Sequence, residues 1–150
     1  KGLNALNVNL CFNNETLKAS ASTIIGNDIT LDMPSVGATI NIILASLYAE
    51  GKTLIKNAAK EPEIVDFINF LNKMGANIKV HDKEAIITGP TKLNGCEIKT
   101  TDLRAGAALA LAGLCADGKT VISDSHYIKR GYSDFAKKLQ LLGADVTEND

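Results

Sequence analysis

The sequence of 150 residues has little of several features that mark particular classes of protein. It has no tryptophan and only three cysteines, Cys11, Cys96 and Cys115, without the Cys-x-x-Cys spacing of a zinc site. An odd number of thiols at such spacing argues against a disulfide framework and fits reduced cysteines in the cytoplasm. The two histidines, His81 and His126, are far apart in the sequence and have no partners at metal-ligand spacing. We therefore expect no metal site and no cofactor.

Long apolar runs and an excess of charge are also missing. The longest apolar stretches, around residues 40–49 and 105–116, fall well short of the roughly 20 residues that span a bilayer. Residues 1–7 contain no apolar core of a signal peptide. The net charge is -1, whereas general nucleic-acid binders carry a basic surplus. The composition predicts a cytoplasmic globular protein with no nucleic acid and no membrane among its partners.

An internal repeat is the most informative feature of the sequence. Residues 49–55, AEGKTLI, match residues 116–122, ADGKTVI, at an offset of 67 residues. Residues 71–77, LNKMGAN, match residues 139–145, LQLLGAD, at an offset one residue longer. Two matches in nearly the same register indicate two copies of one structural unit.

Each copy predicts alternating strands and helices, which makes the chain an α/β protein. In the first copy we expect strands at 29–32, 53–57, 77–81 and 85–88, and helices at 36–50 and 62–74. In the second we expect strands at 97–100, 120–124 and 145–148, and helices at 103–117 and 132–142. Four glycines are expected to cap helix C-termini in the left-handed conformation: Gly51, Gly75, Gly118 and Gly143.

The first 28 residues predict the end of a helix followed by a hairpin of strands 8–12 and 16–21. We interpret this segment as the tail of a preceding unit. The chain then divides into residues 1–28, a first βαβαββ unit at 29–95 and a second βαβαβ unit at 96–150.

A candidate anion site lies at residues 35–37, Ser-Val-Gly, where an expected strand turns into a helix. Free backbone amides and the helix dipole favour a negative group at such a position. The hydroxyl of Ser35 adds a donor. The simpler alternative is that Ser35 caps its helix, and the two roles are compatible.

The only two arginines of the chain, Arg104 and Arg130, are each expected to open a helix of the second copy. Because both connections leave the same end of their preceding strands, the two guanidinium groups are expected to project from one edge. The planar fork of arginine matches a carboxylate or a phosphate with two parallel hydrogen bonds. The alternative is a surface pair that contacts nearby carboxylates. Glu61 and Glu63 are a candidate carboxylate pair, but their place at a helix N-terminus explains both more simply.

Four sequence runs resemble the bacterial UDP-N-acetylglucosamine enolpyruvyl transferases. They are DMPSVGAT at 32–39, NAAKEPEIVD at 57–66, TDLRAGAA at 101–108 and HYIKRGY at 126–132. The resemblance implies repeated βαβαββ units that form inside-out α/β barrels, with helices inside and sheets outside. It also implies transfer of the enolpyruvyl group of phosphoenolpyruvate to the 3-hydroxyl of UDP-N-acetylglucosamine, with release of phosphate, as the first step of peptidoglycan synthesis.

The same resemblance implies roles for individual residues. The segment that would bind the diphosphate-uridine part of UDP-N-acetylglucosamine consists of Met33, Pro34, Ser35, Val36 and Gly37. Arg104 and Arg130 would hold phosphoenolpyruvate and stabilise the charge that develops during addition. Asp102 would cap its helix and orient Arg104, or touch the substrate.

The chain departs from this family in length, because it joins the end of the family's first domain to the end of its other domain. We expect the junction near Val80–Glu84. The early Lys-Asn pair, the mobile loop with the reactive cysteine and the aspartate base of the family have no counterpart here. Cys115, on an apolar helix, is expected to be a buried, inert thiol.

We therefore expect the chain alone to be inactive. The alternative is a non-catalytic anion-binding or assembly module derived from the family. Because two units and a tail leave one helical face open, we also expect a homo-oligomer or a companion chain that supplies the missing units.

Overall fold

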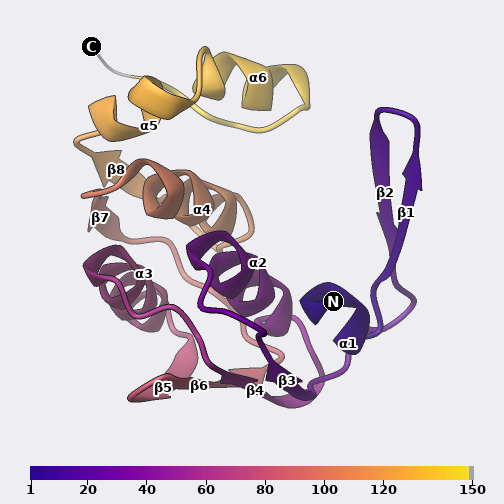
Figure 1. Ribbon diagram of the computed structural model, residues 1–150. Helices are drawn as coiled ribbons and strands as arrows, with labels where there is room; N and C mark the ends of the chain where they lie inside the picture. Colours follow the sequence, from indigo (N-terminus) through magenta and orange to yellow (C-terminus); the bar gives the residue numbers. More distant parts are fainter. Residues whose placement is uncertain (149–150) are drawn as a thin grey trace.

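The computed structural model describes residues 1–148 and has an α/β architecture (Figure 1). The chain opens with helix α1 (Gly2–Ala5) and the hairpin β1 (Asn9–Asn13) and β2 (Thr16–Ser20). The first unit contains β3 (Asp28–Thr30), α2 (Val36–Ser46), β4 (Gly51–Lys56), α3 (Pro62–Lys73), β5 (Asn77–His81) and β6 (Glu84–Gly89). The second contains β7 (Glu97–Lys99), α4 (Leu103–Leu114), β8 (Val121–Ser123), α5 (His126–Gly131) and α6 (Phe135–Leu141).

The strands of residues 1–148 form three separate sheets. The first unit has a four-stranded sheet in the order β3-β4-β6-β5, in which β3 and β4 run parallel and the other pairs antiparallel. Strands β7 and β8 form a parallel pair, and β1 and β2 an antiparallel hairpin. Helix α4 packs against both α2 and α3, with the strands outside these helices (Figure 1). This arrangement agrees with the expected layout of helices inside and sheets outside.

The apolar core lies between these helices and the four-stranded sheet. It is built from the inward positions of α2, α3 and α4 and from alternate residues of the strands, among them Ile43, Leu47, Ile55, Phe67 and Leu109. Burial of these side chains is the main term that holds the helices on the sheet. None of the helices in residues 1–148 is long and apolar enough to cross a membrane.

The repeat found in the sequence is also a repeat of backbone geometry. The amides of Gly26 and Gly95 donate to the carbonyls of Glu50 and Asp117 at 2.9 and 2.7 Å. A Cβ at either glycine would lie within 2.4 Å of a main-chain carbonyl oxygen, so only glycine fits at both places. The two units therefore begin with the same close approach of two backbones.

A second pair of equivalent hydrogen bonds ties each unit to the segment before it. The amide of Ile25 donates to the carbonyl of Leu6 at 3.2 Å, and the amide of Asn94 donates to the carbonyl of Met74 at 2.8 Å. Leu6 and Met74 are the C-terminal caps of α1 and α3. Each unit thus starts from the end of a helix and a hairpin that precede it.

Most expected elements are confirmed within a few residues, but two helices are shorter than expected. Helix α2 ends at Ser46 and α4 at Leu114, three to four residues early. Gly51 and Gly118 have the positive φ that was expected, 90° and 83°. They lie beyond the turns that follow these helices, whereas Gly75 and Gly143 directly follow a helix cap.

The C-terminal part differs more from expectation. The helix expected at 132–142 is replaced by two short helices, α5 and α6. The break occurs because Tyr132 is extended and Asp134 adopts a left-handed conformation with φ 52°. The strand expected at 145–148 is not formed. In the first unit the corresponding strand, β5, pairs with β6, and residues 1–148 contain no second-unit counterpart of β6 that could satisfy the backbone of such a strand.

Candidate functional site

The candidate site is built from the loops that lead from strands into the N-termini of α2, α3 and α4. Because β3 and β4 are parallel neighbours, their carboxyl ends and the helices that follow lie at one edge of the sheet. The amide of Ala59, before α3, donates at 3.0 Å to the buried hydroxyl of Thr39 in the first turn of α2. Glu63 in the first turn of α3 contacts Arg104 in the first turn of α4. Three helix N-termini are therefore joined in a row.

The Ser-Val-Gly segment forms the start of α2. The hydroxyl oxygen of Ser35 accepts a hydrogen bond from the amide of Ala38 at 3.3 Å, so the predicted capping role is confirmed. The side chain of Val36 is buried in the core, which leaves only its backbone amide for a ligand. Gly37 is exposed, and nothing lies within 4 Å of the place a Cβ would take. Met33 and Pro34 are both exposed on the loop before the helix.

Asp102 and Arg104 form the corresponding start of α4. One carboxylate oxygen of Asp102 accepts from the amides of Arg104 and Ala105 at 2.8 and 3.0 Å, which confirms its capping role. The same oxygen lies 3.9 Å from Nε of Arg104. Asp102 thus satisfies two free amides of the helix and holds the guanidinium group close to its own helix end.

The outer end of the Arg104 guanidinium group is engaged by α3. Its Nη2 donates to Oε1 of Glu63 at 2.9 Å, with side chains 48% and 20% exposed. A second contact joins the same helices, since the hydroxyl of Thr101 donates to Oδ2 of Asp66 at 3.0 Å. The sequence indicated nearby carboxylates as alternative partners for the arginines, without indicating which ones. It could not name Glu63, because no sequence spacing links residues of two different units.

Arg130 is placed differently from expectation, because it lies in the last turn of α5 rather than at the start of a helix. Helix α5 packs on the first turn of α4: a Cβ at Gly131 would lie 2.8 Å from Leu103, and one at Gly106 would lie 2.9 Å from Ile128. The backbone of Arg130 is therefore next to the N-terminus that carries Arg104. Its side chain is exposed, and in residues 1–148 it makes no hydrogen bond or ion pair.

The expectation that Cys115 is buried is wrong, because its side chain is exposed. Helix α4 ends at Leu114, so the thiol sits on the cap beyond the buried stripe of the helix. It neighbours the phenol of Tyr48, whose pKa burial raises to about 12, with the Cys115 thiol as a further cause. The residues 1–148 contain no cluster of three histidine, cysteine or acidic side chains that could hold a metal ion.

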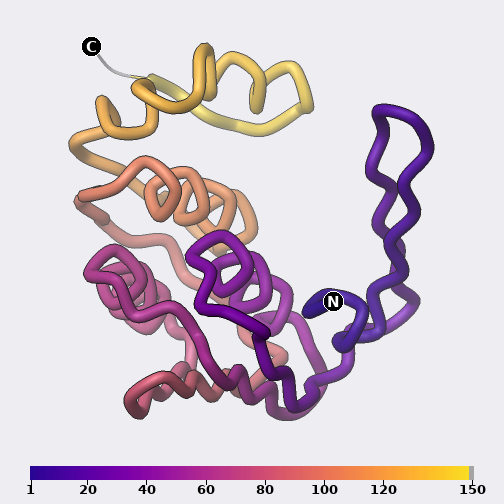
Figure 2. Tube along the Cα trace, viewed as in Figure 1, coloured from indigo at the N-terminus to yellow at the C-terminus, as the bar shows by residue number. Residues whose placement is uncertain are grey.

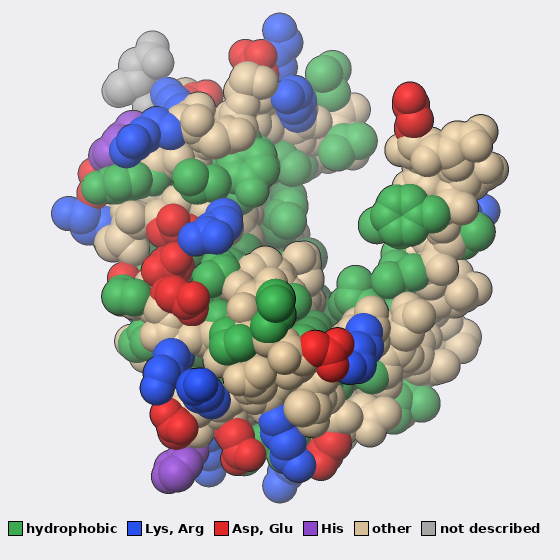
Figure 3. Space-filling view, in the orientation of Figure 1, with side chains coloured by type: hydrophobic (Ala, Val, Ile, Leu, Met, Phe, Trp, Pro, Cys, Tyr) green, Lys and Arg blue, Asp and Glu red, His purple; other side chains and the backbone are tan. Residues whose placement is uncertain are grey.

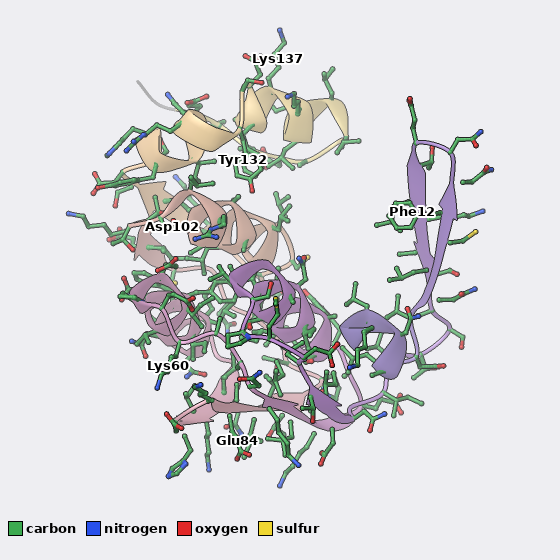
Figure 4. All side chains as sticks on the ribbon, in the orientation of Figure 1. Phe12, Lys60, Glu84, Asp102, Tyr132 and Lys137 are labelled. Atoms are coloured by element: carbon green, nitrogen blue, oxygen red, sulfur yellow. The ribbon has the colours of Figure 1, made fainter. Side chains whose placement is uncertain are left out.

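Figure 4 labels three residues on or near these loops, Asp102, Tyr132 and Lys60. Asp102 lies on the side of the helical layer away from the hairpin, and Tyr132 lies just above α4 on the segment that joins α5 to α6. Lys60, on the loop before α3, makes an exposed ion pair with Asp82 at 3.0 Å. The row of helix N-termini therefore carries both cationic and acidic groups.

The fold matches that of the carboxyvinyl (enolpyruvyl) transferases. The family model for EPSP synthase (3-phosphoshikimate 1-carboxyvinyltransferase) matches residues 1–97 and, in a second segment, 80–139. The chain belongs to this family.

Several curated relatives carry a more specific name. UDP-N-acetylglucosamine 1-carboxyvinyltransferase 2 of Clostridium acetobutylicum is 42% identical over 151 residues, which cover the whole chain and 36% of the relative. The protein of the same name in Staphylococcus aureus (strain N315) is 41% identical, and this chain again covers 36% of its length. The chain thus spans little more than a third of the length of these relatives.

A further relative aligns over a longer stretch. UDP-N-acetylglucosamine 1-carboxyvinyltransferase 1 of Clostridium acetobutylicum is 29% identical over 285 residues, which include 97% of this chain and 68% of the relative. Since the chain has 150 residues, a long stretch of that relative has no counterpart here.

Among solved structures, the enolpyruvyl transferase NikO from Streptomyces tendae matches 98% of this chain with a TM-score of 0.83 and 26% identity. The chain corresponds to 35% of NikO. EPSP synthase from Acinetobacter baumannii matches with a TM-score of 0.51 at 20% identity, which supports the fold alone. The α/β fold expected from the sequence is confirmed.

Proposed function

We propose that the chain is part of a UDP-N-acetylglucosamine 1-carboxyvinyltransferase, which moves the enolpyruvyl group of phosphoenolpyruvate to the sugar 3-hydroxyl and releases phosphate. Such a protein would act in the cytoplasm in peptidoglycan synthesis. The observation that carries the proposal is the row of helix N-termini, with Ser35 at one end and the Asp102–Arg104 pair at the other. The 42% identity to a relative of that name over the whole chain supports it.

The start of α2 would bind the diphosphate of the nucleotide sugar. The first amides of a helix have no partner within it, so those of Val36 and Gly37 are free to donate to phosphate oxygens. The Ser35 hydroxyl accepts from Ala38 and keeps its proton for a third hydrogen bond. The open space at Gly37 lets a ligand approach the backbone. Met33 and Pro34, both exposed, would pack against the nucleotide.

Arg104 and Arg130 would bind phosphoenolpyruvate, which presents a carboxylate and a phosphate to two guanidinium forks. In the reaction the sugar hydroxyl loses its proton and adds to the phosphate-bearing carbon of phosphoenolpyruvate, while the neighbouring methylene carbon gains a proton. Phosphate then leaves and the methyl group gives up a proton, which re-forms the double bond. Fixed cations would stabilise the negative charge on the departing phosphate. Arg104 would have to break its ion pair with Glu63 to bind the ligand. Arg130 has no such pair to break in residues 1–148. Asp102 would position Arg104 from the helix cap.

We propose that the chain alone does not catalyse the reaction. The groups that the family resemblance implies for proton transfer have no counterpart in this sequence, and catalytic groups that act together lose most of the rate when several are removed. Phosphate release from phosphoenolpyruvate and UDP-N-acetylglucosamine should be at background. Turnover close to that of a full-length relative would overturn this part of the proposal.

Binding of UDP-N-acetylglucosamine, measured by calorimetry, tests the site itself. The wild-type chain is expected to bind, and Gly37→Leu is expected to lose binding while its circular dichroism and unfolding midpoint stay unchanged. Asn41→Leu, one helical turn further on the exposed face of α2, is the matched control and is expected to bind normally. A wild-type chain that does not bind the sugar nucleotide contradicts the proposal.

A second candidate function is a non-catalytic anion-binding or assembly module derived from this family. The ion pair between Arg104 and Glu63 favours it, because the guanidinium group already has a carboxylate partner. In that case Arg104→Ala should lower the free energy of unfolding without changing phosphoenolpyruvate binding. A loss of that binding in Arg104→Ala supports the transferase site instead.

A further inference from the structure

The loop from β3 into α2, residues 31–35, is held at its start by two successive residues from the end of β4. The amide of Leu31 donates to the carbonyl of Lys56 at 3.0 Å, which extends the parallel pairing of β3 with β4. Nδ2 of Asn57, the residue after β4, donates to the carbonyl of Leu31 at 3.0 Å. Residues 32–34 are all exposed, so burial does little to fix the loop beyond this point. The backbone of Leu31 is therefore the anchor of the loop.

The far end of the loop is held from the same segment, residues 57–59. The amide of Thr39 donates to the carbonyl of Ser35 at 2.9 Å in the first turn of α2. The hydroxyl of Thr39 in turn accepts from the amide of Ala59 at 3.0 Å. Figure 2 shows loop 31–35 and this segment next to each other, where the chain leaves β3 and β4. Segment 57–59 therefore holds both ends of the stretch that contains the proposed diphosphate-binding residues.

The residue type at position 57 has to meet two requirements. The backbone of Asn57 is left-handed, with φ 59°, a conformation that is costly for most residues but common for glycine and asparagine. The side chain must also donate a hydrogen bond, which glycine and an ionised aspartate cannot do. An aspartate would in addition place a negative charge close to the helix starts, where acidic side chains already lie among basic ones (Figure 3). Asparagine meets both requirements without adding charge.

The second unit fixes its corresponding loop in another way. Asp124, 67 residues after Asn57, has the same left-handed backbone with φ 57°. Its carboxylate forms an ion pair with Lys99 at 3.2 Å and has no proton to donate to the loop before α4. In that loop the hydroxyl of Thr100 donates to the carbonyl of Asp102 at 2.9 Å. The loop before α4 is thus braced by one of its own side chains, whereas the start of the loop before α2 depends on Asn57.

We propose that Asn57 is a positioning residue for the anion site at the start of α2, acting through the carbonyl of Leu31. The inference rests on the proposed function for its ligand, the diphosphate of a nucleotide sugar. The amides of Val36 and Gly37 can both donate to phosphate oxygens only while loop 31–35 holds them in one orientation, because hydrogen bonds weaken steeply as their angle departs from linear. Loss of the Asn57 donor frees the start of the loop, and with it the direction in which these amides point.

Amide NMR spectra of the chain without ligand test the positioning directly. Asn57→Gly keeps the left-handed backbone and removes the donor, so the amide signals of Val36 and Gly37 are expected to shift and broaden. Asn7→Gly is the matched control. Asn7 is also left-handed, with φ 65°, and its Nδ2 donates to the carbonyl of Thr23 at 3.0 Å, but on the chain before β3 rather than after it. The two signals are expected to stay in place in Asn7→Gly, and equal changes in both variants, or none in either, would overturn the proposal.

Calorimetric titration with UDP-N-acetylglucosamine tests the consequence for the ligand. Asn57→Gly is expected to bind about tenfold more weakly, as for the loss of about one hydrogen bond, while phosphoenolpyruvate binding at Arg104 stays unchanged. Asn57→Asp keeps the shape of the side chain but has no proton to donate at neutral pH, and it is expected to bind at least as weakly as Asn57→Gly. Asn7→Gly is expected to bind like the wild-type chain.

The outcomes distinguish this inference from the proposed function. A wild-type chain that does not bind the sugar nucleotide contradicts the proposed function, and the NMR signals of Val36 and Gly37 then still decide whether Asn57 positions the loop. Wild-type affinity in both Asn57→Gly and Asn57→Asp overturns the inference and leaves the proposed function in place. Equal weakening for both ligands, or the same weakening in Asn7→Gly, shows a general loss of structure and also overturns it.

Discussion

The guanidinium group of Arg104 on α4 donates to the carboxylate of Glu63 on α3 at 2.9 Å, and this contact joins the N-termini of two helices from different units. It places a carboxylate where the proposed function needs the carboxylate or phosphate of a ligand. Glu63 thus competes with the ligand for Arg104.

Glu63→Gln is expected to strengthen phosphoenolpyruvate binding several-fold, because Arg104 no longer has to give up an anionic partner. The ion pair is partly exposed, so the loss in the free energy of unfolding should stay below about 1 kcal/mol. Calorimetric titration and urea unfolding measure the two effects. Glu61→Gln, an exposed neighbour outside the pair, serves as control. Weaker binding in Glu63→Gln would show that Glu63 helps to hold the ligand rather than competing with it.

Asp102→Ala is expected to lower the free energy of unfolding by about 1–2 kcal/mol, because the carboxylate caps two amides of α4. Asp102→Asn keeps a capping oxygen and should cost only a few tenths of a kcal/mol. Urea unfolding of both variants gives the comparison. Equal losses in the two variants would show that the charge beside Arg104 matters more than the cap.

The phenol of Tyr48 should ionise well above the usual range of a tyrosine, because partial burial raises its pKa to about 12. Between pH 10 and 12 an unfolded Tyr48 would lose its proton while the folded one keeps it, so stability falls as the pH rises through this range. Tyr48→Phe should lose less stability over the same range. Ultraviolet titration of the phenolate and thermal unfolding between pH 9 and 12 check this, and a Tyr48 that titrates near pH 10 contradicts it.

Two buried threonines should respond in opposite ways to replacement by valine. The Thr39 hydroxyl accepts the Ala59 amide at 3.0 Å, whereas the Thr53 hydroxyl is buried with no partner in residues 1–148. Thr39→Val should therefore cost about 1–3 kcal/mol, since it leaves a buried amide unpaired. Thr53→Val should be neutral or stabilising, because it removes an unpaired polar atom. Urea unfolding of the two variants decides the matter, and similar losses in both would contradict the assignment.

The sequence predicted what depends on local patterns and on the repeat. The positive φ at Gly75 and Gly143, the cap at Ser35, and the hairpin at the N-terminus follow from residue type and spacing. These features need only a few neighbouring residues, and for that reason one sequence is enough to find them.

The features that were missed or wrong depend on contacts between distant segments. Glu63 meets Arg104 only because α3 and α4 pack together. The helix expected at 132–142 breaks at Asp134. The strand expected at 145–148 is not formed, because its counterpart β5 pairs with β6 and residues 1–148 contain no second-unit counterpart of β6. Cys115 is exposed because α4 ends one residue before it. None of these depends on a spacing that the sequence displays.

The equivalent hydrogen bonds from Ile25 to Leu6 and from Asn94 to Met74 have a consequence for how such chains can change in length. Each unit attaches to the one before it through the same main-chain donor and acceptor, with a glycine next to the donor. A deletion or duplication of whole units therefore recreates the same hydrogen-bonded junction, whichever units it brings together. Proteins of this fold are accordingly free to gain or lose whole repeats. Insertion or loss of part of a repeat would misplace this junction between units and the helices on both sides of it.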